Sequence, residues 1–338
     1  MALAGGALPE TVCSHLGGAG GGAFQILSFL DRWDAAALVL VCSELRDMAV
    51  DYCAHVRWRR RRGGGATQAA APLSPSEWPL GRLTGLEAQL NAPLSSLRAA
   101  GSSSSKAAAA AGSLAGITAK SDRHRCAAVQ LGAVAAVLAA LSQHAGEAAV
   151  CAAGAEALSA IAGGPSHSCA EACSAALPAL LAALGRHAAD ARLCVAAAQA
   201  LSCLAAGSLS SREACLSAGS VPLLVAALGR HAASAAVCRE ACTALGCLAA
   251  GPASCQEACA AGGAVPALAA ALRGHVADAG VCRAAAQALS CLAAGPASCR
   301  QACLAGGSAV PAVLAALSRH VEDAAVCQSA AWALESSV

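Results

Sequence analysis

The sequence predicts an all-α solenoid, in which short helical repeats stack one after another. Three residue types recur in phase over most of the 338 residues. Histidines are spaced 43, 44, 44 and 45 residues apart, a cysteine follows each by seven residues, and prolines keep the same step. The histidines are His144, His187, His231, His275 and His320. A period in the forties that is built from helical segments indicates repeats that bury a core against their neighbours.

Each repeat is predicted to contain two shorter helices and a longer third one. In one copy, an S-x-x-E capping box starts the first helix at Ser254, and Gly263 allows the turn that follows. Pro266 lies near the start of the second helix, where its missing N–H costs nothing. Asp278 is placed to cap the third helix. Third-helix leucines repeat at 201, 245, 289 and 334, and we expect all four to be buried in equivalent sites.

This order of helices, with a third helix of the form AAxALxxLA, resembles the armadillo repeat. The resemblance covers residues 86–338, as about six repeats with boundaries near 125, 168, 212, 256 and 300. The third helices look most like those in the armadillo domains of leucine-rich-repeat kinases, although the sequence carries no kinase motif. The resemblance implies a right-handed superhelix of the armadillo type.

In the family, partners bind in a concave groove that the third helices line. Aligning these helices gives a first row of candidate partner-binding residues, Glu156, Gln199, Thr243, Gln287 and Trp332, and a second row that contains Cys203, Cys247 and Cys291. Nuclear-import receptors have a similar fold but carry tryptophan in the first row and asparagine in the second. Only Trp332 fits that pattern, which argues against import-receptor function. The alternative is that both rows are plain exposed helix surface.

No catalytic or cofactor motif is present in the sequence. It contains no phosphate-binding glycine loop after a strand, no G-x-S-x-G and no H-E-x-x-H. Zinc needs several ligands at ~2.1 Å, whereas the histidines recur on successive repeats. We expect each histidine to cap its second helix by bonding the last carbonyls, and we expect no metal, no cofactor and no enzymatic activity.

Composition limits location and partners. Twenty cysteines with no secretory signal indicate reduced thiols that pack in the core, and hence a cytoplasmic or nuclear protein. The apolar stretches are shorter than the ~20 residues of a membrane span, and a net charge of +2 gives no general case for nucleic acid.

The N-terminal residues 1–62 differ in character from the repeats. Leu8, Pro9, Ile26, Leu27 and Leu30 stand in a pattern that resembles an F-box, which closes on a late tryptophan at position 58. This resemblance implies docking on a Skp1-type adaptor of a cullin-RING ubiquitin ligase. A glycine-rich run at 17–22 makes the segment about ten residues longer than the family pattern. The alternative is a small helical cap on the first repeat.

An arginine run within 57–62 precedes a Gly, Ala, Pro and Ser-rich segment at 63–85, which is predicted to be a linker. The run fits a nuclear signal or the solvated end of a helix. The sequence thus predicts a protein–protein interaction module, which in the F-box interpretation acts as a ubiquitin-ligase adaptor. A plain armadillo scaffold is the alternative, and the regulatory part of a kinase is disfavoured because no catalytic segment is present.

Overall fold

The computed structural model describes residues 80–337, with gaps at 102, 165–166 and 306–308. All regular elements in this part of the chain are α-helices, which confirms the predicted fold class. The compact unit that holds the repeats begins at Gly85. The F-box-like pattern and the arginine run both lie outside the described residues, so these two interpretations stay predictions.

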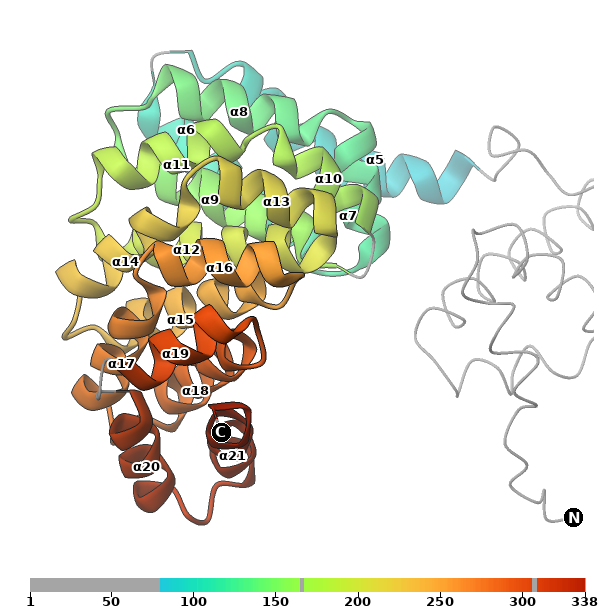
Figure 1. The fold of residues 1–338 in the computed structure, drawn as a ribbon. Coiled ribbons are helices and arrows are strands. Elements are labelled where there is room, and N and C mark those ends of the chain that lie inside the picture. The colour runs from blue at the N-terminus through green and yellow to red at the C-terminus, as the bar shows by residue number, and fades with distance from the viewer. Residues whose placement is uncertain (1–79, 102, 165–166, 306–308, 338) are drawn as a thin grey trace, which may run out of the picture. The chain divides into compact units, whose positions relative to one another are not determined.

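The helices follow the predicted order of three, and their stacking can be followed in Figure 1. The first helices are α7 (Asp122–Gln130), α10 (His167–Ser174), α13 (Leu209–Ser217), α16 (Ala253–Ala261) and α19 (Ala297–Ala305). The second helices are α8 (Ala133–Gln143), α11 (Leu177–Arg186), α14 (Ser220–Arg230), α17 (Ala264–Gly274) and α20 (Ala309–Arg319). The third helices are α9 (Ala148–Ala162), α12 (Ala191–Gly207), α15 (Ala235–Ala249), α18 (Ala279–Ala293) and α21 (Ala324–Ser337).

Two further helices form a shorter repeat at the N-terminal end of this unit. Helix α5 (Leu80–Arg98) begins within the predicted linker and leads into α6 (Ser104–Thr118), which packs on α9 as a third helix does. The Arg98 guanidinium then donates a 2.7 Å hydrogen bond to the Leu131 carbonyl in the turn between α7 and α8. The weakly repetitive stretch before residue 126 is therefore part of the solenoid.

Helices of the same kind pack against one another in chain order and make three layers. The layer of third helices holds many of the large buried side chains, including Leu114, Leu158, Leu201, Leu245 and Leu289, none more than 2% exposed. Full burial of a leucine contributes about 1.5–3 kcal/mol, far more than an alanine. The leucines hold the layer together, while the many alanines let the helices approach closely.

The third helices begin where their N-cap residues predict. Asp190 and Asp278 each accept a 2.9 Å hydrogen bond from the backbone N–H three residues on, and Ser234 occupies the same place. The predicted capping box at Ser254 is wrong. Helix α16 begins one residue earlier and its N-cap is Pro252, whose extended backbone (φ −64°, ψ 168°) sets the entry into the helix without a side-chain bond.

The turn between the first and second helices depends on glycine, as predicted. Gly219 and Gly263 have φ of +81° and +83°, in the left-handed region that other residues rarely adopt. Pro266 is the third residue of α17, still within the first turn, where backbone N–H groups have no partner in the helix.

The expectation that Leu334 is buried like its equivalents is wrong. Leu334 is only half-buried, since α21 is the last described helix and no further helix covers its outer side. The same end of the unit exposes Leu314 (45%) and Val321 (73%).

The helices are apolar but mostly short. Within the described residues, no single helix is long and apolar enough to cross a membrane. Four bent pairs of consecutive helices meet the length and composition criteria when each pair is taken together.

Candidate functional site

The first row of predicted partner-binding residues lies on five third helices that pack side by side, α9, α12, α15, α18 and α21. We call the solvent-facing side chains of these helices the third-helix surface. Thr243 and Gln287 are exposed, whereas Glu156 and Gln199 are half-buried. The sequence alignment therefore places one accessible side chain from each repeat along a single line, although no partner is present to test its role.

The amides and hydroxyl of this row are suited to hydrogen bonding. The side chains of Gln199 and Gln287 make no hydrogen bond to any described residue, so both keep donor and acceptor groups for a ligand. The Thr243 hydroxyl donates a 2.9 Å bond to the Arg239 carbonyl and retains its acceptor capacity. Such groups can pair with the backbone of an extended chain.

The charges on this surface come mainly from arginines that the sequence analysis did not single out. Arg192 forms a two-pronged pair with Glu156 across α12 and α9, with N···O distances of 3.0 and 3.2 Å. The hydrogen bond and the negative charge of Glu156 raise the pKa of Arg192. Arg239 pairs at 3.0 Å with Glu240. The next third helix adds an exposed Arg283, which has no ion pair with a described residue.

The cysteines of the second row pack at the edge of this surface. Cys203, Cys247 and Cys291 are half-buried, and burial raises the pKa of both Cys247 and Cys291. A thiol with a raised pKa carries little thiolate at neutral pH and is a poor nucleophile. All three half-buried side chains stay candidates for contact with a partner, and no observation here tests that role.

Trp332 is the one aromatic side chain of the first row, and it is 49% exposed. It lies on α21, at the far end of the row from Glu156. An exposed indole beside polar residues can stack on a ligand side chain and donate through its N–H. The remaining first-row positions carry no aromatic slot.

The repeating histidines bind neighbouring repeats together. In four of the five, Nε2 donates to the carbonyl of the residue that follows the preceding histidine, and because a carbonyl only accepts, Nε2 must carry the proton. The bonds are His187 to Ala145, His231 to Ala188, His275 to Ala232 and His320 to Val276, at 2.7–2.8 Å. We call these four bonds the histidine ladder. The predicted cap on the histidine's own helix is wrong, because the side chain reaches the neighbouring repeat instead.

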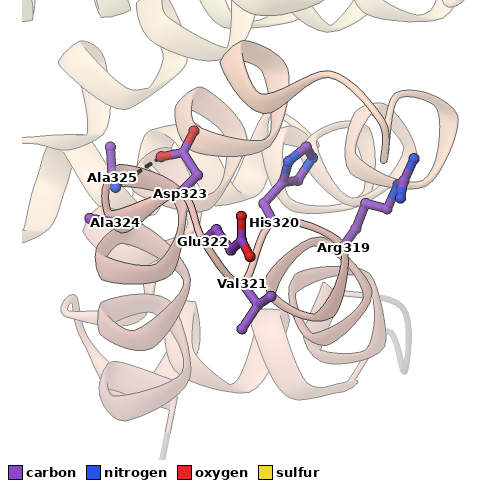
Figure 2. Close-up of a pocket in the computed structure, with 7 residues that line it drawn as sticks. All are labelled: Arg319, His320, Val321, Glu322, Asp323, Ala324 and Ala325. Atoms are coloured by element: carbon purple, nitrogen blue, oxygen red, sulfur yellow. Dashed lines mark hydrogen bonds between the residues drawn. The ribbon is translucent and has the colours of Figure 1, made fainter.

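The cysteines seven residues later complete the same network. The Cys194 thiol lies 3.7 Å from the Ala188 carbonyl oxygen, which also accepts the His231 hydrogen bond. Figure 2 shows the corresponding turn at His320, where the Asp323 carboxylate accepts a 3.0 Å bond from the Ala325 N–H. The spacing of histidine and cysteine thus reflects convergence on backbone carbonyls. No group of three or more His, Cys, Asp or Glu side chains in the described part of the chain could hold a metal ion.

A second set of contacts joins the carboxyl ends of the third helices. Arg212 of α13 donates 3.0 Å bonds to the carbonyls of Ala205 and Ala250, at the ends of α12 and α15. Cations are favourable at these negative ends of the helix dipoles. The equivalent residues Arg125, Gln256 and Arg300 also donate to carbonyls near the ends of third helices, so this position recurs with the repeat period, although the sequence analysis did not single it out.

The sequence matches no protein-family model and no curated protein. Solved structures do match. An engineered protein is 26% identical with a TM-score of 0.66, over 73% of this chain and 98% of the other. A second engineered protein is 29% identical with a TM-score of 0.65, over 73% and 96%. A designed armadillo repeat protein in complex with the peptide (KR)4 is 22% identical with a TM-score of 0.62, over 76% and 100%.

The repeats have the armadillo-type superhelical fold. A further similar structure, 24% identical with a TM-score of 0.61 over 75% of this chain and 99% of the other, is described as a computationally designed armadillo repeat protein for modular peptide recognition. The armadillo interpretation of the repeats is therefore confirmed at the level of the fold.

Proposed function

We propose that this protein is a binding module whose third-helix surface holds an extended segment of a partner protein. The observation that carries the proposal is the line of accessible polar side chains on side-by-side third helices, with Gln199 and Gln287 making no bond to described residues. Two of the similar structures are described as peptide binders, one of them in complex with (KR)4.

The geometry sets the length of the partner segment. Packed helices are ~8–10 Å apart, and an extended chain advances ~3.4 Å per residue, so each repeat spans about three residues. The path from α9 to α21 crosses four such steps, which corresponds to about twelve residues. An extended peptide has backbone N–H and C=O groups on both sides, and the amides of Gln199 and Gln287 can pair with them.

The charge on the surface favours a neutral or acidic segment. Glu156 and Glu240 are already neutralised by arginines, whereas Arg283 adds a cation without an ion pair among the described residues. A peptide of alternating lysine and arginine would meet repulsion from Arg283, whereas Arg239 is already paired with Glu240.

The test is selection of random twelve-residue peptides on the purified chain, followed by affinity measurement on two matched double variants. Gln199→Ala with Gln287→Ala should weaken the selected peptides about tenfold, since two hydrogen bonds of ~0.5–1.5 kcal/mol each are lost. Gln143→Ala with Gln301→Ala removes two exposed glutamines outside the surface and should leave affinity unchanged. Equal affinity for both double variants would reject the third-helix surface as the binding site.

We further propose, on the sequence pattern alone, that the N-terminal segment links such a partner to ubiquitin ligation in the cytoplasm or nucleus. Ile26, Leu27 and Leu30 supply the apolar face that an F-box presents to a Skp1-type adaptor. Leu27→Asp with Leu30→Asp should then abolish co-purification with the adaptor while leaving the circular dichroism of the repeats intact. If the wild-type chain shows no binding at micromolar adaptor, the segment is a cap or has another role.

A further inference from the structure

Two cysteines from adjacent repeats face each other at the N-terminal part of the solenoid. The Sγ atoms of Cys126 in α7 and Cys169 in α10 lie 3.7 Å apart. A disulfide needs ~2.05 Å between sulfurs, so the side chains must close by less than two ångströms. Helices α7 and α10 are neighbours in the layer of first helices, which holds the two sulfurs close in the reduced protein.

The two thiols differ in their access to solvent. Cys126 is half-buried, whereas Cys169 is only 1% exposed. A small oxidant in solution therefore reaches Cys126 first. Cys169 then lies in place to react with the oxidised sulfur from the protein side.

The surroundings of Cys126 are positively charged. Helix α7 and the turn before it carry Lys120, Arg123 and Arg125, against the single carboxylate of Asp122, which pairs with Arg125. Partial burial together with the charges of Lys120 and Arg123 lowers the pKa of His124. Positive charge beside a thiol is typical of cysteines that oxidise readily.

We propose that Cys126 and Cys169 form an oxidation site, at which hydrogen peroxide joins two adjacent repeats through a disulfide. In the first step, the Cys126 sulfur attacks one peroxide oxygen; the O–O bond breaks, a sulfenic acid forms and one water leaves. In the second step, the Cys169 sulfur attacks the Cys126 sulfur; the S–S bond forms, the S–O bond breaks, and the hydroxide leaves with the Cys169 proton as a second water. The two sulfurs together lose two electrons, which reduce the peroxide.

The disulfide restricts the separation of two adjacent repeats. It closes a loop of 43 residues, from α7 through α8 and α9 to α10, and so ties two repeats that otherwise separate when the array opens. A cross-link of this length restricts the unfolded chain, and oxidised protein should melt several degrees above reduced protein. Dithiothreitol reverses the change by thiol exchange.

The chain offers a digest that isolates the two cysteines. Cleavage after arginine and glutamate cuts at Arg125, Glu147, Glu156 and Glu171, which places Cys126 on 126–147 and Cys169 on 157–171. The intermediate fragment 148–156 carries Cys151, and 172–186 carries Cys173. The full chain is treated with equimolar hydrogen peroxide, its remaining thiols are blocked, and it is digested without reductant. The expected product is 126–147 linked to 157–171, which dithiothreitol separates.

Two variants make the order of events testable. Cys169→Ala removes the second thiol, so Cys126 should accumulate as a sulfenic acid that dimedone captures, and the rise in melting temperature should vanish. Cys255→Ala changes a buried cysteine of a later first helix and should leave the linked fragments and the rise unchanged. Recovery of 126–147 and 157–171 only as separate blocked peptides after peroxide would overturn the proposal. Linkage of Cys126 to Cys151 or Cys173 instead would overturn it equally.

Discussion

Replacing His231 with leucine should lower the free energy of unfolding, whereas the same replacement at His144 should not. The His231 Nε2 donates a 2.8 Å hydrogen bond to the Ala188 carbonyl of the preceding repeat. The His144 Nε2 is buried and makes no hydrogen bond to a described residue, although His144 occupies the equivalent place. The repeat that precedes His144 consists of α5 and α6. It has no histidine at the equivalent position, and the turn between its two helices contains Gly101, whose φ is +49°.

The size of the effect follows from the two groups. Loss of one hydrogen bond costs about 0.5–1.5 kcal/mol, and an acceptor left without a partner costs about 1–3 kcal/mol. In the variant, the Ala188 carbonyl still has the Cys194 thiol as a weak donor at 3.7 Å, which reduces the cost of leaving this acceptor without the histidine. We therefore expect His231→Leu to lose about 1–2 kcal/mol. His144→Leu removes a buried group without a partner and should be neutral or stabilising.

The measurement is urea unfolding of the full chain, followed by far-UV circular dichroism, with midpoints compared at equal slope. The double variant His231→Leu with Cys194→Ala adds a second criterion. This variant removes both donors to the Ala188 carbonyl. Its free energy of unfolding should therefore fall by more than the sum of the decreases in the two single variants. Equal losses for His231→Leu and His144→Leu would refute the histidine ladder as a source of stability.

Two further predictions concern the turns and the buried thiols. Gly263→Ala should lower the free energy of unfolding by about 1–2 kcal/mol because φ is +83° there, although a Cβ would meet no atom within 4 Å. Gly229→Ala, inside α14 and equally open, should raise it by up to ~1 kcal/mol. Urea unfolding that shows lower stability for both variants would contradict this reasoning. Burial raises the pKa of Cys173 and Cys215 to about 12, above the ordinary 9.0, so folding favours the neutral thiols. This stability is present below pH 9.0 and is lost as pH rises toward 12, because the unfolded thiols ionise first. The double variant Cys173→Ala with Cys215→Ala should therefore show a smaller decrease of the unfolding midpoint above pH 9.0 than the wild type. Parallel decreases in the two proteins would contradict this prediction.

Sequence reasoning reached the fold because the signals were periodic and local. Gly263 marks a left-handed turn and Asp278 an N-cap through chemistry confined to a few residues, and both functions are seen in the structure. The capping box at Ser254 failed because Pro252 fixes the entry of the chain two residues earlier. The prediction that Leu334 is buried was wrong because burial in a solenoid depends on the next helix, which a pattern within one repeat does not reveal.

The contacts between repeats were the part that the sequence concealed. The regular histidines were visible, but their acceptors lie 42–44 residues away, so the spacing alone suggested a cap on the same helix. Arg212 holds the ends of two third helices. Its position recurs as Arg125, Gln256 and Arg300, which also donate to carbonyls near the ends of third helices, but the residue type changes from repeat to repeat. On the candidate surface, the alignment found Gln199 and Gln287, whereas the pair of Arg192 with Glu156 emerged only once neighbouring helices were placed side by side.

Hydrogen exchange of the chain with and without a selected twelve-residue peptide tests the central claim most directly. Binding along the third-helix surface should slow backbone exchange in α12, α15 and α18, near Gln199, Thr243 and Gln287, while α13 and α16 of the first-helix layer change little. Protection confined to the first or second helices, with the third helices unchanged, would contradict the account.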